Sequence, residues 1–435
     1  MMKNLKYKML GLVLLWTVLA GQAKAQEAAK RYSLQECKQM ALENNKKIKS
    51  AKLEEDAALM AQKSAELNAY PTLDGSVLGL HLGKPLGGAM GGLIPKNMVD
   101  GSLTATQPIY VGGKIRYGKE ATAKAVAIRQ EQKAMTEADV LLEVEKAYWQ
   151  VIQVQEKLVM ANKFKEMLQA LRTDLKNAYD AGMIYKNDLL RVEVSLNEAE
   201  LGITQAQDGL VMSKLNLAQI MGQAGETSFA LADSVAGNFT ATAQLVEAAA
   251  NNRPELRLLQ KSIEIEEIQN KILQADRLPT FGVSLSGSAA VGKGVNIQDG
   301  SNFMKTYYGV ASLSIPIFDW GKRASKVKEQ SYKVTIQKHQ LEQTRELINL
   351  EVQNAYLQMR QSVKKIELSS ISLQQAEENL KLTQNRFKAG TVVGKDVQEA
   401  QAIWQQAYSK LIDAKIDFKI NEVSYKKSIG ELRPQ

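Results

Sequence analysis

Cysteine and histidine are almost absent from this chain of 435 residues, which contains only Cys37, His81 and His339. A single cysteine cannot form an intrachain disulfide, and the three residues cannot supply a cysteine metal cluster or a histidine-based catalytic site. No nucleophile–base or metal-ligand spacing occurs elsewhere, so we expect no enzyme activity, no cofactor and no metal. Proline is also scarce, with 8 residues, and aromatic residues make up 6%. This composition favours helix.

Long hydrophobic runs are missing beyond the N-terminus. Three lysines precede an apolar run at residues 10–20, and small residues follow at Ala23 and Ala25, so residues 1–25 are predicted to be a secretory signal peptide. Gln22 stands where a lipoprotein signal needs cysteine, so we expect no lipid anchor there. No later stretch approaches the 18 apolar residues of a transmembrane helix. The net charge of +9 includes four lysines of this segment, and the small remainder argues against a nucleic-acid partner.

The chain repeats its own pattern at a fixed offset of 208 residues. Gly113-Lys114 recurs as Gly321-Lys322, and Ala181-Gly182 recurs as Ala389-Gly390. The same offset relates Pro71-Thr72 to Pro279-Thr280, Pro108 to Pro316, Asp188 to Asp396 and Gly222 to Gly430. One offset that holds over about 150 residues predicts a tandem duplication of a whole structural unit. We therefore divide the mature chain into repeat 1 (residues 26–222), a connector (223–243) and repeat 2 (244–435).

Each repeat contains one helix of unusual length, predicted at residues 114–180 and 322–388. The first range has no proline and one glycine, Gly118, so nothing forces a break. At ~1.5 Å per residue, such a rod is on the order of 100 Å long. Its apolar residues alternate between spacings of three and four, as from Val140 through Val144 to Ala147. This 3.5-residue period is typical of a coiled coil, because helices of large soluble bundles, the alternative, rarely exceed ~25 residues.

Each repeat also contains two segments in which the period changes to two. In these segments apolar residues alternate with small polar ones, as Leu103 and Ala105 do with Ser102 and Thr104. The predicted strands are residues 73–82, 99–108, 281–290 and 307–316. About ten tilted residues suffice to cross an outer membrane, although a hairpin lying on a soluble domain is the alternative. Four strands cannot close a barrel, and an open sheet edge in lipid is costly, so we expect the chain to oligomerise.

Shorter helices complete each repeat. Ser33 and Glu36 have the spacing of a capping box at the start of the first of them. The predicted ranges are 33–68 and 188–221 in repeat 1, and 245–275, with Pro254 in its first turns, and 396–429 in repeat 2. Two short helices placed end to end equal one rod, so each repeat can present two full-length antiparallel rods.

Several short motifs recur at the ends of these elements. They are the pairs Asn44-Asn45 and Asn251-Asn252, the strand entries ending in Pro71-Thr72 and Pro279-Thr280, the sequences at residues 108–114 and 316–322, and the reversals at residues 179–182 and 387–390. An exported chain of two such repeats resembles the TolC family of outer-membrane export ducts over essentially its whole mature length. The resemblance implies a mainly α fold with membrane β structure. It also implies a homotrimer in which twelve strands close a β-barrel in outer-membrane lipid and twelve rods form an α-barrel across the periplasm.

The resemblance further implies partners and sites. A periplasmic adaptor joins such a duct to an inner-membrane pump of the RND or ABC type, and the duct itself does no chemistry. The reversals at Gly182 and Gly390 are then the periplasmic tips that meet the adaptor. The flanking side chains expected to form this contact are Met183, Ile184, Val392 and Val393.

Acidic residues beside the tips are candidates for a gate. Asp188, Asp396 and Glu399 match family positions that line the narrow periplasmic end. The alternative is that Asp396 and Glu399 form a helix-capping pair, with Asp188 as a cap in repeat 1, where Arg191 replaces the second acid. Some members carry an arginine where this chain has Val392, so a gate that depends on that arginine must be held differently here.

A second class of function fits part of the sequence. A periplasmic adaptor or structural coiled-coil protein without a pore would also be exported and contain heptads. Adaptors, however, carry one helical hairpin between compact domains, whereas this chain has two equal copies with strands of membrane length.

Overall fold

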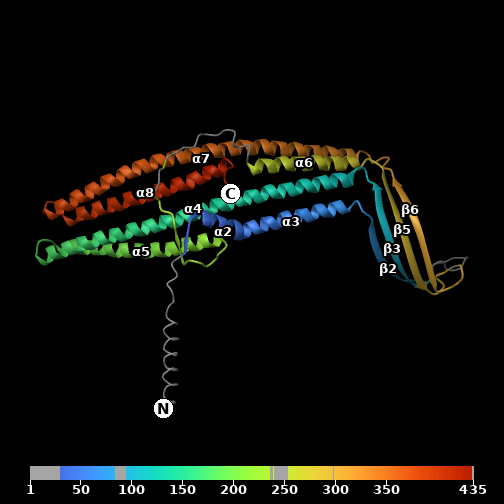
Figure 1. Cartoon of the computed structure of the whole chain (residues 1–435), viewed down its shortest axis with the longest axis horizontal. Coiled ribbons are helices and arrows are strands. Elements are labelled where there is room, and N and C mark those ends of the chain that lie inside the picture. Colours follow the sequence, from blue (N-terminus) through green and yellow to red (C-terminus); the bar gives the residue numbers. More distant parts are fainter. Residues whose placement is uncertain (1–29, 84–94, 236–238, 240–252, 297, 434–435) are drawn as a thin grey trace, which may run out of the picture.

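The computed structural model describes residues 30–83, 95–235, 239, 253–296 and 298–433, which form a long molecule of helices with a β-sheet at one end (Figure 1). The predicted signal peptide, the Asn251-Asn252 pair and much of the predicted connector lie outside the described residues, as does the start predicted at residue 245. Within the described ranges, none of the helices combines the length and the apolar character that a bilayer crossing requires.

Two rods run the length of the helical part. Helix α4 (Lys114–Asp180) and helix α7 (Lys322–Lys388) each contain 67 residues, and their starts are separated by the same offset of 208. Gly118 does not interrupt α4. Both rods begin next to the sheet and end at a reversal at the far end of the molecule (Figure 1).

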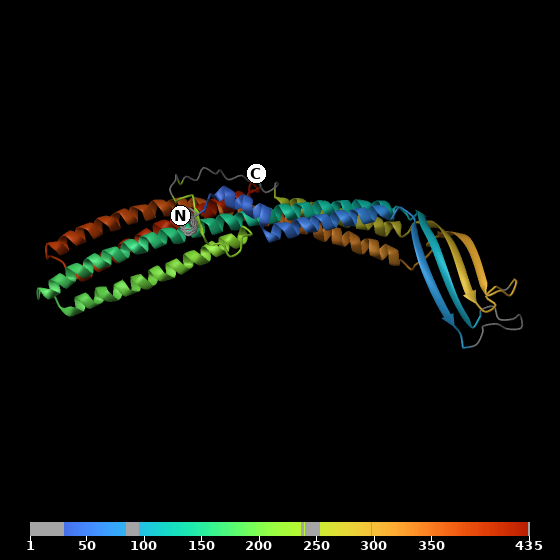
Figure 2. The same ribbon diagram turned by 60° about the horizontal axis from the view of Figure 1, so that its bottom comes forward.

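Shorter helices lie beside the rods in two sections. Helices α3 (Lys46–Leu67) and α6 (Pro254–Ala275) lie on the side of the sheet, and α5 (Lys186–Ile220) and α8 (Gly394–Ser428) lie on the side of the reversals (Figure 1). The rods and shorter helices of the far section form two separate hairpins, α4 with α5 and α7 with α8 (Figure 2).

The single helix predicted over residues 33–68 is wrong, because the structure has two helices there. Helix α2 (Leu34–Asn44) ends where Asn45 adopts an extended conformation with ψ 131°, and α3 begins at the next residue. The side chain of Asn45 caps α3 by accepting a hydrogen bond from the Lys47 amide at 2.8 Å. Ser33 and Glu36 do form the predicted capping box of α2.

Asn45 also forms one of two equivalent joints at mid-length. Its amide group donates a hydrogen bond to the carbonyl of Ile220 at 2.8 Å, which connects the start of α3 to the end of α5. The equivalent position in repeat 2 is Arg253, whose guanidinium donates to the carbonyl of Ser428 at 3.0 Å and connects the start of α6 to the end of α8. Arg253 is extended, so α6 begins at Pro254, which occupies its first turn as predicted but is its first residue.

The sheet at the end of the molecule is antiparallel and has the order β2-β3-β5-β6. Its strands are β2 (Thr72–His81), β3 (Asn97–Tyr110), β5 (Thr280–Gly292) and β6 (Phe303–Ser314). The two repeats are joined through β3 and β5, in a register that places Leu103 opposite Gly287. Pro108 does not close β3 as predicted, because a bulge beside it allows the strand to reach Tyr110. Strand β6 ends before Pro316, two residues earlier than predicted.

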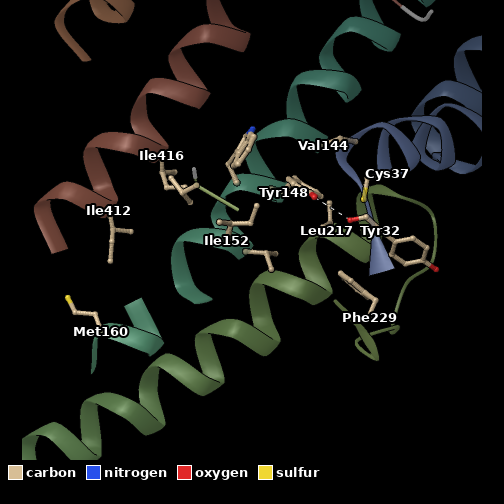
Figure 3. Close-up of a cluster of buried hydrophobic side chains, with 14 of the residues drawn as sticks. Tyr32, Cys37, Val144, Tyr148, Ile152, Met160, Leu217, Phe229, Ile412 and Ile416 are labelled. Carbon is tan, nitrogen blue, oxygen red and sulfur yellow. Dashed lines mark hydrogen bonds between the residues drawn. The ribbon is translucent and has the colours of Figure 1, made fainter. Parts of the chain in front are cut away.

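A compact core lies where the sections meet, around a small parallel sheet that the sequence analysis did not identify. This sheet pairs β1 (Lys30–Tyr32) with β4 (Phe229–Leu231). Tyr148 of α4 is fully buried beside Tyr32 (Figure 3). Its hydroxyl donates to the Asp233 carboxylate at 2.6 Å. Cys37 is also fully buried, and burial raises its pKa to about 12. The core therefore fixes the rods at mid-length and keeps Cys37 as an inert thiol.

Candidate functional site

The two reversals have the same backbone geometry. Gly182 and Gly390 have φ angles of 74° and 71°, in the left-handed region that glycine adopts without strain. The next amides, of Met183 and Thr391, donate back to carbonyls five residues earlier at 2.9 and 3.0 Å. These bonds define Schellman caps, so both glycines have a clear structural role at the tips.

Side chains beside the tips differ in their exposure. Met183 is 74% exposed and Val393 is 60% exposed, so both can contact another molecule. Ile184 instead packs against the cluster that contains Leu175, and Val392 is half-buried. Tyr185, which the sequence analysis missed, is 84% exposed. It directly follows an expected contact residue, but a lone tyrosine beside a turn gave no signal from sequence alone.

The acidic candidates lie near the starts of α5 and α8. Both helices begin two residues earlier than predicted, so Asp188 and Asp396 are third residues of their helices and are not N-caps. The Asp396 carboxylate nevertheless accepts a hydrogen bond from the Val393 amide at 3.1 Å. It thus satisfies one of the free amides at the end of α8. The prediction that Asp396 is the N-cap and pairs with Glu399 is therefore wrong, although Asp396 does stabilise the helix start.

Glu399 lies in a different environment from the two aspartates. It is exposed and lines a groove of about 740 Å³ between α4, α5 and α8, together with Arg191 and Lys395. Asp188 and Asp396 are not among the residues that line this groove. Arg191 and Glu399 occupy equivalent positions of the two repeats, so the structure brings opposite charges from both repeats into one groove.

The two hairpins are held together along a seam between α4 and α8. Asp413 of α8 accepts a hydrogen bond from Gln153 and forms an ion pair with Lys157, both at 2.7 Å. Nearer the tips, the Gln401 amide donates to the carbonyl of Met167 at 3.2 Å. Gly394 permits the closest approach, because a Cβ there would lie 2.7 Å from a methyl group of Leu175. The chain thus positions both tips as one unit.

The two faces of the large sheet differ in chemistry. One face carries hydroxyl groups, which pair between strands at 2.8 Å for Ser76 with Ser102 and at 2.9 Å for Thr104 with Ser286. The register places Asp74 and Asp100 on this same face. The opposite face exposes large apolar side chains to more than half of their full area, namely Leu73, Val77, Leu103, Leu285 and Leu313. Such an apolar surface requires a non-aqueous partner.

Comparison with known proteins identifies the fold and its class. The model of the outer membrane efflux protein family matches residues 38–223 and 245–431. The chain belongs to this family. The outer membrane protein TolC of Escherichia coli K12 is 24% identical over 355 residues, which cover 79% of this chain and 71% of TolC. The alkaline protease secretion protein AprF of Pseudomonas aeruginosa is 21% identical and covers 73% of this chain and 66% of AprF.

Solved structures of outer-membrane channels have the same fold. VceC of Vibrio cholerae aligns with a TM-score of 0.74 at 15% identity, covering 91% of this chain and 96% of VceC. The open state of MtrE of Neisseria gonorrhoeae aligns with a TM-score of 0.74 at 18% identity, covering 92% and 89%. The resemblance to the TolC family is thus confirmed, and the chain is an outer-membrane efflux channel protein. Because family members are channels, the expectation of no enzyme activity is confirmed and the pore-free adaptor is not supported.

Proposed function

We propose that three copies of this chain form the exit duct of a tripartite efflux or type I secretion system. The observation that carries the proposal is the large sheet, which has an apolar face and free edges at β2 and β6 within the described residues. In lipid, each unpaired backbone group at such an edge costs several kcal/mol. Pairing β6 of one copy with β2 of the next removes both edges, and three copies give a closed barrel of twelve strands.

Aromatic side chains support a membrane boundary at the rod end of this sheet. Phe318 and Trp320 are 71% and 88% exposed, and their rings meet edge to face at a centroid distance of 4.9 Å. Tyr110 is 48% exposed at the end of β3. Exposed aromatic rings favour the interface between hydrocarbon and water. With this boundary on the periplasmic side, the rods extend across the periplasm and form the tunnel.

The tips would then meet the partners. We infer that Gly182 and Gly390 shape the two turns and that Met183, Val392 and Val393 contact a periplasmic adaptor, whereas Ile184, which packs inward, supports the turn from within. The adaptor would connect the duct to an inner-membrane pump of the RND or ABC type. One relative is named for secretion of a protease and the family is named for efflux, which is compatible with either route.

Asp188, Asp396 and Glu399 are the proposed gate residues of this duct. Each trimer would place three copies of each carboxylate near the narrow end of the tunnel. Like charges brought close together attract counter-cations, so the closed end would favour cations over anions.

Assembly and conduction test the proposed function together. The protein, extracted from outer membranes in mild detergent, should have the native mass of a trimer and dissociate on heating. It should also give single-channel currents in planar bilayers. Recovery of the protein as a monomer in the soluble periplasmic fraction, without currents, would contradict the proposal.

A separate experiment tests the docking surface. Changing the exposed Met183 and Val393 to glutamate should abolish export in cells, because a charge in an apolar contact is costly to bury. Trimer mass and single-channel current should not change. The matched control is Met183→Leu with Val393→Ile, which keeps the apolar surface and should export normally. Normal export by the glutamate variant would place the adaptor contact elsewhere.

A further inference from the structure

The apolar face of the large sheet ends in positive charge at the edge farthest from the rods. Lys305 lies on β6 opposite Ala289, and by strand alternation it shares the face of Leu285 and Leu313. Lys293 lies in the turn that follows β5. Lys96 directly precedes β3 at the same end of the sheet, and by strand alternation it lies on the side of Met98 and the hydroxyl face. All three side chains are exposed. We call these three lysines the distal rim.

The rim lysines differ from many other lysines in having no acidic partner. Lys124, for example, forms an ion pair with Glu264 of α6, and Lys114 forms one with Asp276, which directly follows α6. Among the residues that the structure describes, no carboxylate lies within ion-pair distance of the three rim lysines.

A neighbouring copy cannot supply the missing charge from its strands. The acidic residues of the strands, Asp74 and Asp100, both lie on the hydroxyl face, and no Asp or Glu lies on the apolar face. In the turn between β5 and β6, Asp299 accepts a hydrogen bond from the Ser301 amide at 2.9 Å. Residues 84–94 contain no acidic residue in their sequence. Asp299 keeps its negative charge, but three rim lysines outnumber this one carboxylate in each copy, so closure of the barrel leaves the rim with a net positive charge.

The spacing along β6 places the rim at the level of lipid headgroups. Ten residues separate Lys305 from Ile315, near the aromatic boundary. At ~3.4 Å per residue and a tilt of about 40°, they span roughly 26 Å along the membrane normal. This distance is close to the ~25 Å height of the apolar band of an outer-membrane barrel. With the rods in the periplasm, the rim faces the outer leaflet.

We propose that the distal rim binds the phosphate groups of lipid A, the anionic glycolipid of the outer leaflet. Lysine binds phosphate as a point charge, and an unpaired lysine at the end of an apolar surface is stable only where headgroups or water can solvate it. Lipid A offers fixed phosphates at this depth together with acyl chains for the apolar face below. The inference rests on the proposed function, since it requires the sheet to cross the outer membrane with its rim outward.

Lipid binding to the detergent-solubilised trimer tests the proposal. Native mass spectrometry would compare bisphosphorylated lipid A, monophosphorylated lipid A and phosphatidylethanolamine. We expect bisphosphorylated lipid A to bind most tightly. In the triple variant Lys96→Gln, Lys293→Gln and Lys305→Gln, its affinity should fall on the order of 10- to 100-fold, because each lysine near an anionic surface contributes about tenfold or less.

Control variants separate the rim from general charge and from folding. Lys52→Gln, Lys63→Gln and Lys381→Gln remove three exposed lysines of the helical part and should leave lipid A binding unchanged. If the triple rim variant does not form trimers, Lys305→Gln alone, with Lys305→Arg as the charge-conserving control, gives the same comparison.

Two outcomes would overturn the proposal. One is equal lipid A affinity for the rim variant and the wild type, and the other is binding of phosphatidylethanolamine as tight as that of lipid A. Single-channel currents in bilayers without lipid A test the duct independently. Currents with no preference for lipid A would therefore reject the rim site alone, whereas a protein that neither inserts nor conducts would reject the duct as well.

Discussion

The two rods have equal lengths and related sequences, but the chain buries them to different extents. Helix α4 packs against α3, α5, α6 and α8, whereas the described contacts of α7 are with α6 and α8. Leu357 of α7 is 56% exposed, while the equivalent residue of α4, Trp149, is 7% exposed. The stripe with the heptad period is buried on both rods, as Val144 of α4 and Val352 and Met359 of α7 show. On α7, apolar side chains outside this stripe, such as Leu357, remain uncovered within one chain.

The uncovered apolar residues of α7 follow most of its length. Those exposed by more than half of their area are Ile336, Leu347, Leu350, Leu357, Leu368 and Leu382. Burial of one such side chain contributes about 1.5–3 kcal/mol. A neighbouring copy that covered this surface would therefore stabilise the assembly strongly. The comparison suggests that α4 holds the subunit together and that α7 holds the subunits to one another.

The largest expected effect comes from charging the two rods at different positions. Leu350→Asp with Leu357→Asp on α7 should abolish the trimer, because carboxylates would face an apolar interface, while the folded monomer persists. Val144→Asp at a fully buried position of α4 should instead unfold the chain. Native mass spectrometry and circular dichroism distinguish these results. Stable trimers of the α7 variant would show that its exposed face is not the subunit interface.

Much of this architecture could be predicted because its signals are periodic. The rods were predicted at the bounds that the structure has, since 67 residues without proline leave few alternatives. The break at Asn45 could not be predicted, because the residue leaves the helix to reach Ile220, which is distant in sequence. The small sheet of β1 and β4 depends on a similar long-range pairing of three-residue segments, which have no detectable period.

The candidate site could be predicted only in part. The turn glycines were recognisable because each fits the left-handed position after a long helix. The exposure of the side chains beside the turns could not be predicted from the sequence. Ile184 packs inward, whereas the adjacent Met183 and Tyr185 are exposed. Rotation of a helix decides such differences, and rotation is set by packing against other elements. For the same reason, the shared groove of Arg191 and Glu399 became visible only in three dimensions.

The two mid-length joints provide the next comparison, because one is neutral and the other is ionic. Arg253 forms ion pairs with Glu255 and Glu351, at 2.7 and 3.3 Å, and its side chain is almost fully buried. Arg253→Ala would leave the Glu255 carboxylate, which is 24% exposed, without its partner and should cost about 1.5–3 kcal/mol of unfolding free energy. Asn45→Ala should cost only about 1 kcal/mol, the typical value for a lost cap. Chemical denaturation of both variants checks this order, and equal losses would contradict it.

The same joints should respond differently to acid. Burial of the Glu255 carboxylate raises its pKa, but hydrogen bonds from Arg253 outweigh burial, and the net pKa is lowered. A lowered folded-state pKa contributes stability that is present above the unfolded value of 4.5 and is lost as pH falls through the folded value. The wild type should therefore lose stability below about pH 4.5 more steeply than Glu255→Gln. Parallel pH profiles would contradict the assignment.

A smaller effect is expected at the entries to the rods, where Gly112 and Trp320 are equivalent. Both have positive φ angles, and Trp320 is the one non-glycine residue with this geometry in the described part of the chain. A Cβ at Gly112 would lie 2.8 Å from the carbonyl oxygen of Ala275, so Gly112→Trp should lower the melting temperature markedly. Trp320→Gly relieves roughly 1 kcal/mol of strain and should leave the melting temperature in detergent unchanged or slightly higher. A large loss of stability in Trp320→Gly would show that its ring packs within the protein.

The smallest effect should appear at the proposed gate, where the repeats carry opposite charges at one position. Glu399 of repeat 2 corresponds to Arg191 of repeat 1, and both line the same groove. Asp396→Asn with Glu399→Gln should therefore reduce cation preference a few-fold in single-channel recordings, and Arg191→Gln should increase it. Both changes should shrink at 1 M salt, where the screening length is about 3 Å. Asp396 also accepts the Val393 amide, and asparagine keeps an acceptor there but loses the negative charge at the helix start, so Asp396→Asn alone carries a stability cost of roughly 0.3–1 kcal/mol. Arg191→Gln and Glu399→Gln leave the bond between Asp396 and Val393 intact, so these two variants isolate the electrostatic effect. Unchanged selectivity in both, with a lowered melting temperature in Asp396→Asn, would leave Asp396 a helix-stabilising residue with no part in gating.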